Sequence, residues 1–417
     1  MRKNSMHHGL LIAITYGAML IFGLVENIKG VSYPLIKTEF DASYQQQGAL
    51  VSLLSYCYVF FCLIAGVFLG RFGVKRSLLS GFICILLGAG LVFFMPTFWA
   101  VGAAMLLLYA GFGFFEVGVN ALGTQVFTAR AALLMSLLHF FYGAGAIAGP
   151  KAAGILTNQG MGWRQIYLLV IPLTLLVFIP ALAARFPGDQ TDASGEAAPE
   201  LQPEGQKAGN ERTAVPKITF LGALKIPMVW AFSITLGLME VVEMSSGNWG
   251  GLYFQDVYQL DPRTDGAAFV SNFYILFTLS RLISGFIIEK IGYMRSLFIA
   301  CIATVIIYAA GFALGVRGIW VLPALGFFIA IMWPTIMAVA MGFFGKQAPV
   351  ITSAIIVLSG ALNSGIQFVI GLTNRFAGEA WGYRSCLVYS IIMVGMLCYL
   401  NHCLRRRANL FDARATS

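Results

Sequence analysis

Runs of about 20 or more mostly apolar residues recur along almost the whole chain of 417 residues. Each run is long enough to cross the hydrocarbon core of a bilayer as an α-helix, and a helix satisfies its own backbone hydrogen bonds in lipid. Hydrophobic residues make up 59% of the sequence and charged residues only 11%, which excludes a soluble globular domain. The sequence therefore predicts an all-α membrane protein.

Twelve such runs can be placed, and we expect each to form a transmembrane helix. The first six lie near residues 10–37, 47–70, 77–96, 98–125, 131–157 and 163–185. The other six lie near residues 221–254, 264–288, 296–316, 318–344, 350–377 and 382–404. The first run is too long, and residues 1–8 too weakly basic, for a cleaved signal peptide, so we expect the first run to be retained.

A single long hydrophilic segment, residues 187–217, separates the two sets of runs. It contains four prolines, several glycines and charges of both signs, and it has no apolar period. Such a segment cannot bury enough apolar surface to offset the entropy lost on ordering. We expect a disordered linker between two six-helix bundles, residues 1–186 and 218–417, the second ending in a short cytoplasmic tail.

The distribution of positive charge predicts the orientation. With the N-terminus inside, 18 of the 27 Lys and Arg residues fall on the cytoplasmic side, as the positive-inside rule requires. Both termini and the linker are then cytoplasmic, in a multi-pass protein of the cell (inner) membrane. The same charges lie in short turns between apolar runs, which argues against a nucleic-acid-binding face. The seven cysteines have no metal-ligand spacing, and we expect no metal or cofactor.

A short motif occurs once in each half, directly after the second run of that half. Residues 66–76 read GVFLGRFGVKR and residues 285–295 read GFIIEKIGYMR. Each copy combines a helix end, a tight glycine turn and a basic anchor, which indicates a duplicated bundle. The residues assigned to this turn are Gly66, Arg71, Gly73, Arg76, Gly285, Glu289, Gly292 and Arg295.

This turn resembles the G-x-x-x-D-R-x-G-x-R-R signature of the major facilitator superfamily, although Gly70 replaces the acid in the first copy. Within that superfamily the chain is similar to the fucose permease group of proton-coupled sugar symporters. The similarity lies in residues 113–120 (GFFEVGVN), 139–150 (HFFYGAGAIAGP) and 333–335 (WPT), and in Glu243 followed by Asn248 and Trp249. The resemblance implies twelve helices in two pseudo-symmetric six-helix bundles around a central cavity, and a transporter that functions as a monomer.

Seven ionisable side chains interrupt the apolar runs. Each costs about 2.5–3.5 kcal/mol at the membrane centre, so such residues normally face a wet cavity or a partner. They are Glu26, Lys29, Glu116, Lys151, Glu240, Glu243 and Arg281. Lys29 either forms an ion pair with Glu26 or contacts the substrate. Lys151 either snorkels to the membrane surface or contacts an anionic substrate. Arg281 is expected to pair structurally with Glu289.

Three of the residues in these runs are candidates for proton coupling. Glu116 and Asn120 lie four residues apart on one helix face, and His139 is expected at a similar depth on the next helix. A carboxylate near an imidazole suits a proton relay; the alternatives are a structural pair and, for His139, core packing. Glu26 is nearly repeat-equivalent to Glu243, and whether Glu26 or Glu116 carries the proton stays open.

Amide and aromatic side chains suggest where a solute binds. Three glycines around Trp249 predict a break in the seventh run at residues 245–251, which is tolerated only beside a cavity or protein. Pro334 predicts a kink after Trp333. An aromatic face with nearby amides and carboxylates suits a polyhydroxylated ligand. The substrate candidates are Asn120, Glu243, Asn248, Trp249, Trp333, Asn363 and Gln367; for Asn363 and Gln367 helix packing is the alternative.

These observations favour a secondary transporter that imports a sugar or similar small polar solute by proton symport, with the proton gradient as its energy source. The alternative is a proton-coupled exporter of drugs or metabolites. A membrane enzyme or a solute sensor is disfavoured, because the sequence lacks nucleophile-elbow, zinc-protease and nucleotide-binding motifs. The expected partners are the solute and the lipid bilayer.

Overall fold

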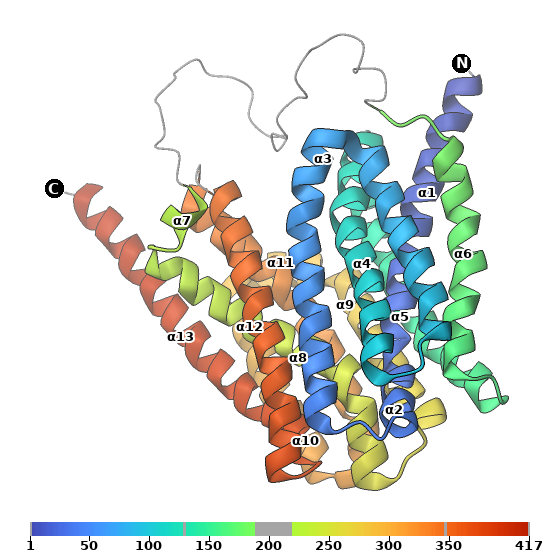
Figure 1. Cartoon of the computed structure of the whole chain (residues 1–417). Coiled ribbons are helices and arrows are strands. Elements are labelled where there is room, and N and C mark those ends of the chain that lie inside the picture. Colours follow the sequence, from blue (N-terminus) through green and yellow to red (C-terminus); the bar gives the residue numbers. More distant parts are fainter. Residues whose placement is uncertain (1, 128–130, 188–218, 346–347, 416–417) are drawn as a thin grey trace.

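The computed structural model describes residues 2–127, 131–187, 219–345 and 348–415. Within these ranges the chain is α-helical apart from short 3₁₀ and π turns, and it contains no β-strand. Eleven helical segments are long and apolar enough to cross a membrane, and one of them, Tyr44–Phe94, folds back on itself and crosses twice (Figure 1). The all-α membrane fold with twelve crossings is therefore confirmed. The predicted linker, residues 187–217, lies outside the described residues except for Pro187.

The helices fall into two groups along the chain (Figure 1). The first group is α1 (Arg2–Asn27), α2 (Lys29–Glu39), α3 (Tyr44–Phe94), α4 (Phe98–Val126), α5 (Ala131–Asn158) and α6 (Trp163–Ala183). The second group is α7 (Phe220–Ala223), α8 (Pro227–Tyr258), η2 (Pro262–Gly266), α9 (Ala267–Ile291), α10 (Tyr293–Ala313), η3 (Gly315–Trp320), η4 (Leu322–Ala324), α11 (Leu325–Phe344), α12 (Ala348–Ala377) and α13 (Trp381–Ala415). Each group has its own hydrophobic core.

The duplicated motif forms the same turn in both groups. Gly73 interrupts α3 with φ 81° and ψ 170°, and Gly292 separates α9 from α10 with φ 91° and ψ 150°. Glycine adopts a positive φ at no steric cost, whereas other residues are strained there. A Cβ would have open space at the other motif glycines, Gly66, Gly70 and Gly285. The backbone conformation therefore requires glycine only at the turn positions, Gly73 and Gly292.

The first predicted span is interrupted where its charged residues lie. α1 ends at Asn27, α2 begins at Lys29, and Ile28 between them keeps right-handed helical angles. Asn27 turns its side chain back to donate a 2.9 Å hydrogen bond to the carbonyl of Gly23. Glu26 and Lys29 therefore flank this short discontinuity.

The predicted break in the seventh span is wrong. α8 is helical from Pro227 to Tyr258, through residues 245–251. The glycines there serve close packing: a Cβ on Gly251 would lie 2.9 Å from the carbonyl oxygen of Gly30, and one on Gly250 would collide with the ring of Phe269. Small residues allow helices to approach in membranes. α11 likewise continues through Pro334.

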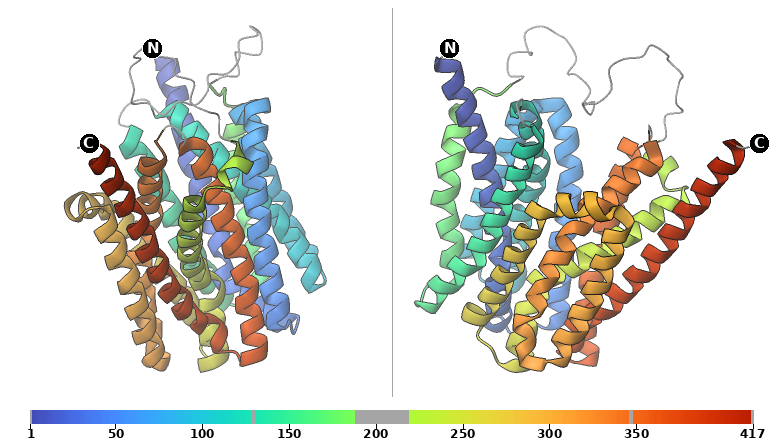
Figure 2. Two further views of the ribbon diagram at one scale, coloured as in Figure 1. Left: turned by 90° about the vertical axis from the view of Figure 1, so that its left-hand side faces the viewer. Right: turned by 180° about the vertical axis from the view of Figure 1, so that it is seen from behind.

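The two groups touch near one face of the molecule and diverge toward the other. We call the face that carries both chain ends the terminal face, and the opposite one the far face (Figure 2, right). Near the far face α3 meets α12 so closely that a Cβ on Gly48 would lie 2.9 Å from the Cα of Gly371. Toward the terminal face Val67 of α3 and Phe286 of α9 are 75% and 78% exposed. The structure is closed at the far face.

Three side-chain contacts join the groups at the far face. Lys37 of α2 lies 3.3 Å from a carboxylate oxygen of Asp256 on α8. The hydroxyl of Tyr44, at the start of α3, donates to the same oxygen. Gln255 donates a 3.3 Å hydrogen bond to Thr38. We call Lys37, Tyr44 and Asp256 the far-face latch.

Candidate functional site

Five side chains of α8 and α12 form a buried hydrogen-bonded group around Gln367. The side-chain oxygen of Gln367 accepts a 2.8 Å bond from the indole of Trp249 and a 3.4 Å bond from the amide of Asn248. Its amide nitrogen donates to Asn363 at 3.0 Å and to Ser245 at 3.3 Å. We call these five residues the amide cluster. Four of them are predicted substrate residues, which the structure brings together from two helices.

The amide cluster holds polar groups that are only partly satisfied. Gln367 is fully buried, and Asn248 and Asn363 are 4% and 7% exposed. The side-chain oxygen of Asn248 is buried and has no hydrogen-bond partner among the described residues, which is costly unless a ligand or water supplies one. Trp249 is 1% exposed, so its ring face is covered in this conformation and becomes available to a solute only if the helices move.

Glu26 forms an ion pair on the first group of helices. Its Oε1 lies 3.2 Å from the Nζ of Lys29, and the two side chains are 11% and 5% exposed. Its other oxygen accepts a 2.7 Å hydrogen bond from the hydroxyl of Tyr142 on α5. Of the two alternatives for Lys29, the structure contains the ion pair. Both oxygens of Glu26 are therefore engaged.

Glu116 has a simpler set of partners. The amide of Asn120, one turn later on α4, donates to the Glu116 carbonyl at 2.6 Å and to its carboxylate at 3.3 Å, so the two share a face as predicted. Tyr58 of α3 is a second hydrogen-bonding neighbour of this carboxylate, and Glu26 and Arg281 of α9 lie within electrostatic range of it. Asn120 thus belongs with the carboxylates and does not contact the amide cluster.

The expected Glu116–His139 pair is not formed, because no hydrogen bond or ion pair joins the two residues in the described part of the chain. His139 is close enough to feel the charge of Arg281. Arg281, from the second group of helices, is therefore within electrostatic range of both Glu116 and His139.

Arg281 is a residue of the site that sequence reasoning assigned elsewhere. It does not pair with Glu289 in the described residues; the two are eight residues apart on α9, about 12 Å along the axis, and Glu289 is exposed. Its guanidinium lies 4.5 Å from the ring centroid of Phe277, and its Nε is buried without a hydrogen-bond partner. Glu116 and Glu243 are both within electrostatic range of it.

The repeat contained the signal that would have identified Arg281. It lies four residues before Gly285, and the equivalent position, four residues before Gly66, is Cys62 of α3. Cys62 is also within electrostatic range of Glu116. Both copies of the motif therefore point this position toward the centre of the molecule.

Glu243 connects the two groups of helices electrostatically. It is 9% exposed and lies within range of Arg281, Glu26 and Lys29. Glu240, one turn earlier, accepts a 3.1 Å hydrogen bond from Ser359, and among these charged residues it is within electrostatic range of Glu243 alone. We call five residues the central charge cluster: Glu26, Lys29, Glu116, Glu243 and Arg281.

The central charge cluster has three carboxylates and two cations. If all five side chains are ionised, one negative charge is uncompensated, and a single proton would make the cluster neutral. The cluster adjoins the amide cluster along α8, because a Cβ on Gly247, the residue before Asn248, would lie 3.5 Å from the Cε of Lys29. Protonation and ligand binding can therefore influence one another over a short distance.

Trp333 stands apart from both clusters. It is 36% exposed and forms no hydrogen bond with the amide cluster in the part of the chain that the structure describes. The described residues contain no group of three His, Cys, Asp or Glu side chains arranged for a metal ion. The two clusters themselves supply carboxylates that can take up a proton and amides that can form hydrogen bonds.

Residues 15–368 match the family model described as Major Facilitator Superfamily. A protein of Helicobacter pylori (strain J99), described as "Putative glucose/galactose transporter", is 22% identical over 427 residues, 95% of each chain. The alignment covers nearly the whole of this chain, including both groups of helices.

Two solved structures share the fold. A variant of the nucleoside transporter NupG aligns with a TM-score of 0.75 at 12% identity, covering 94% of this chain and 99% of that one. A variant of the E. coli fucose:proton symporter FucP aligns with a TM-score of 0.59 at 17% identity, covering 93% and 98%. At these identities the likeness shows the fold and leaves the solute to be argued from the site.

Proposed function

Because the chain belongs to the major facilitator superfamily and is a multi-pass membrane transporter, we propose that it carries a sugar or similar small polar solute by proton symport. The observation that carries the proposal is the uncompensated carboxylate of the central charge cluster beside the amide cluster. A group that gains and loses one proton then lies next to groups that hydrogen-bond a polar ligand.

The chemistry of the amide cluster favours a polyhydroxylated solute. Amide oxygens and nitrogens both accept and donate hydrogen bonds, and an indole face packs against sugar C–H groups. The unpartnered oxygen of Asn248 can accept from a hydroxyl. The Helicobacter pylori relative is named for glucose and galactose, and the E. coli structural neighbour for fucose, which supports testing hexoses first.

We assign the transported proton to Glu116. Glu26 is held by a cation, Lys29, and by Tyr142, whereas the hydrogen-bonding neighbours of the Glu116 carboxylate are the uncharged side chains of Asn120 and Tyr58. Arg281 belongs to the other group of helices, so an ionised Glu116 attracts it across the interface, and a protonated Glu116 does not. Protonation thus changes the attraction between the two halves, which is what coupling to alternating access requires.

The direction of this coupling follows from the membrane potential. A proton that enters with the solute gains about 2.3 kcal/mol per 100 mV. The positive charges indicate that the terminal face is cytoplasmic. In an importer with this orientation, the conformation described here is the one that is open toward the cytoplasm. The protein would then act as a monomer in the cell (inner) membrane, with the linker on the cytoplasmic side.

The test uses purified protein in liposomes. A thermal-shift screen against hexoses, deoxyhexoses, nucleosides, organic acids and cationic drugs first identifies a solute. Glu116→Gln keeps the shape of the protonated acid, so it is expected to exchange labelled solute across the membrane but to lose accumulation driven by an imposed proton gradient. Glu289→Gln is the control, because it makes the same chemical change at an exposed glutamate outside the central charge cluster and should keep proton-driven accumulation.

Two results would reject this assignment. If Glu116→Gln still concentrates solute when a proton gradient is imposed, Glu116 is not the carrier, and Glu26→Gln is examined next. If only hydrophobic cations stabilise the protein and an outward-directed flux follows the proton gradient, the protein is an exporter.

A further inference from the structure

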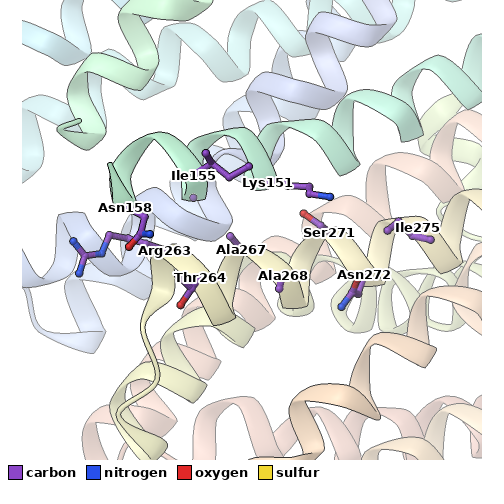
Figure 3. Close-up of a pocket in the computed structure, with 11 residues that line it drawn as sticks. Lys151, Ile155, Asn158, Arg263, Thr264, Ala267, Ala268, Ser271, Asn272 and Ile275 are labelled. Atoms are coloured by element: carbon purple, nitrogen blue, oxygen red, sulfur yellow. The ribbon is translucent and has the colours of Figure 1, made fainter. Parts of the chain in front are cut away.

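A groove of about 290 Å³ lies between α5 and the η2–α9 segment, outside both clusters. Figure 3 shows its two walls, with Lys151 and Asn158 on α5 facing Ser271 and Arg263 on the other side. The walls come from different halves of the molecule. The groove is therefore part of the seam that is closed in this conformation.

Lys151 is the unusual residue of this groove. It is an exposed lysine in a membrane-spanning helix, seven residues before Asn158, where α5 ends, hence about 10 Å inside that end. It forms no hydrogen bond or ion pair with any side chain that the structure describes. Its side chain lies along the groove beside Ser271 (Figure 3). A cation at that depth is stabilised either by snorkelling to the membrane surface or by an anionic partner.

Neither of the two nearby carboxylates forms an ion pair with Lys151 in the part of the chain that the structure describes. Asp261 bonds to Arg263 through both carboxylate oxygens, at 3.0 Å and 3.2 Å from its Nε and 3.0 Å from its Nη2. Asp265 accepts a 3.2 Å bond from Thr264 and lines a small hollow that adjoins the groove at Ala268 and Asn272. The uncompensated charge on the walls of the groove is therefore the ammonium of Lys151.

The groove is polar along part of its length and apolar at its margins. Asn158, Thr264 and Asn272 offer amide and hydroxyl groups, while Ile155 and Ile275 are 51% and 37% exposed. Exposed isoleucines on a membrane-spanning surface contact acyl chains. A polar cavity with one free cation and an apolar margin open to lipid matches the parts of a phospholipid.

We propose that this groove binds the headgroup of an anionic phospholipid, whose phosphodiester accepts hydrogen bonds from Lys151 and whose acyl chains pack on Ile155 and Ile275. A charge-assisted bond from an ammonium to a phosphate is among the stronger polar contacts in proteins. Phosphatidylglycerol fits better than phosphatidylethanolamine, because the amine of the latter would add a second cation near Lys151.

Such a lipid would also act on the transport cycle. It contacts α5 of the first half and α9 of the second, so it binds only while the two helices stay together. A ligand that prefers one conformation shifts the population toward it. Bound lipid therefore favours the state that is closed at the far face.

The binding test is a lipid titration of the purified full-length protein, followed by native mass spectrometry. Phosphatidylglycerol, phosphatidylethanolamine and phosphatidylcholine with the same acyl chains are compared. We expect phosphatidylglycerol to bind about tenfold more tightly than the other two lipids. This ratio corresponds to the free energy of about one hydrogen bond to a charged group. Lys151→Gln should remove this preference, and Lys151→Arg should keep it.

Lys290→Gln is the matched control, because it removes the same charge from an exposed lysine at the terminal end of α9. A photoactivatable phosphatidylglycerol on the unmodified protein gives an answer even if Lys151→Gln misfolds: label is expected in α5 and α9. Label confined to other helices would overturn the proposal, as would full phosphatidylglycerol preference in folded Lys151→Gln. Displacement by millimolar glycerol phosphate would mean that the site takes a soluble phosphate ester instead.

Discussion

Removing the carboxylate of Asp256 is expected to open the far face. Asp256 on α8 pairs with Lys37 at 3.3 Å and accepts from Tyr44, and both partners belong to the first group of helices. Lys37 in turn lies 4.4 Å from the ring centroid of Tyr44. The three residues therefore hold the halves together only while this face is closed.

The magnitude follows from the exposure of the pair. The Lys37 and Asp256 side chains are 20% and 14% exposed, so solvent screens the ion pair and it contributes about 0.5–1 kcal/mol. The hydrogen bond from Tyr44 to a charged group adds about 1.5 kcal/mol. Asp256→Ala loses both, about 2 kcal/mol, which shifts the closed-to-open ratio about 30-fold. Asp256→Asn keeps an acceptor for Tyr44 and should show a smaller shift.

The shift can be measured as a distance distribution between spin labels at Gln159 and Arg317, exposed residues of the far face in the two halves, after the native cysteines are replaced. Asp256→Ala should add a second population at longer distance. Asp261→Asn is the control, because Asp261 bonds to Arg263 within its own turn and does not join the halves. An unchanged distribution in Asp256→Ala would refute the latch.

Three further predictions concern the site, the packing and the topology. Trp249→Ala should weaken solute binding at least tenfold in a thermal-shift titration, because it removes both the indole bond to Gln367 and an aromatic surface; unchanged affinity would place the site elsewhere. Gly250→Ala should lower the melting temperature by several degrees, since its Cβ would collide with Phe269, whereas Gly90→Ala, whose Cβ would have 3.8 Å of clearance, should not; equal melting of the two variants would contradict this. Protease should cleave residues 187–217 only from the cytoplasmic face of the membrane, and cleavage in intact cells from outside would reverse the orientation.

Local chemistry determined the parts of the fold that the sequence predicted well. Apolar run length specifies a membrane helix because the bilayer thickness is fixed. The turns at Gly73 and Gly292 were found because a positive φ selects glycine wherever the turn occurs. Neither inference needed to know which helices touch.

The sequence misled wherever a residue's role depends on a distant neighbour. Gly250 and Gly251 were read as helix breakers, yet they admit the ring of Phe269 and the backbone of Gly30, contacts that no local pattern contains. Arg281 was paired along its own helix with Glu289, whereas its charged neighbours are on other helices. In each case tertiary contact overrides local propensity.

The amide cluster lies between these extremes. The sequence placed Asn363 and Gln367 one turn apart on a helix face, which is enough to predict that they act together. That Gln367 accepts from Trp249 on α8 depends on how deeply each helix sits, and boundaries read from hydropathy are uncertain by several residues, about one helical turn. A helix position that is uncertain by one turn is too imprecise to predict which side chains form a hydrogen bond.

The close approach of Gly48 and Gly371 has a mechanical consequence. At this point α3 and α12 meet backbone to backbone, whereas farther along the same two helices Val59 packs against Gly360. At the glycine pair itself, one helix can therefore roll against the other without first withdrawing a side chain from a groove. If one helix rotates about this contact near the far face, a small change of angle moves the distant ends of the helices by a large distance. A methyl group at either glycine would push the two helices apart and hinder this rotation.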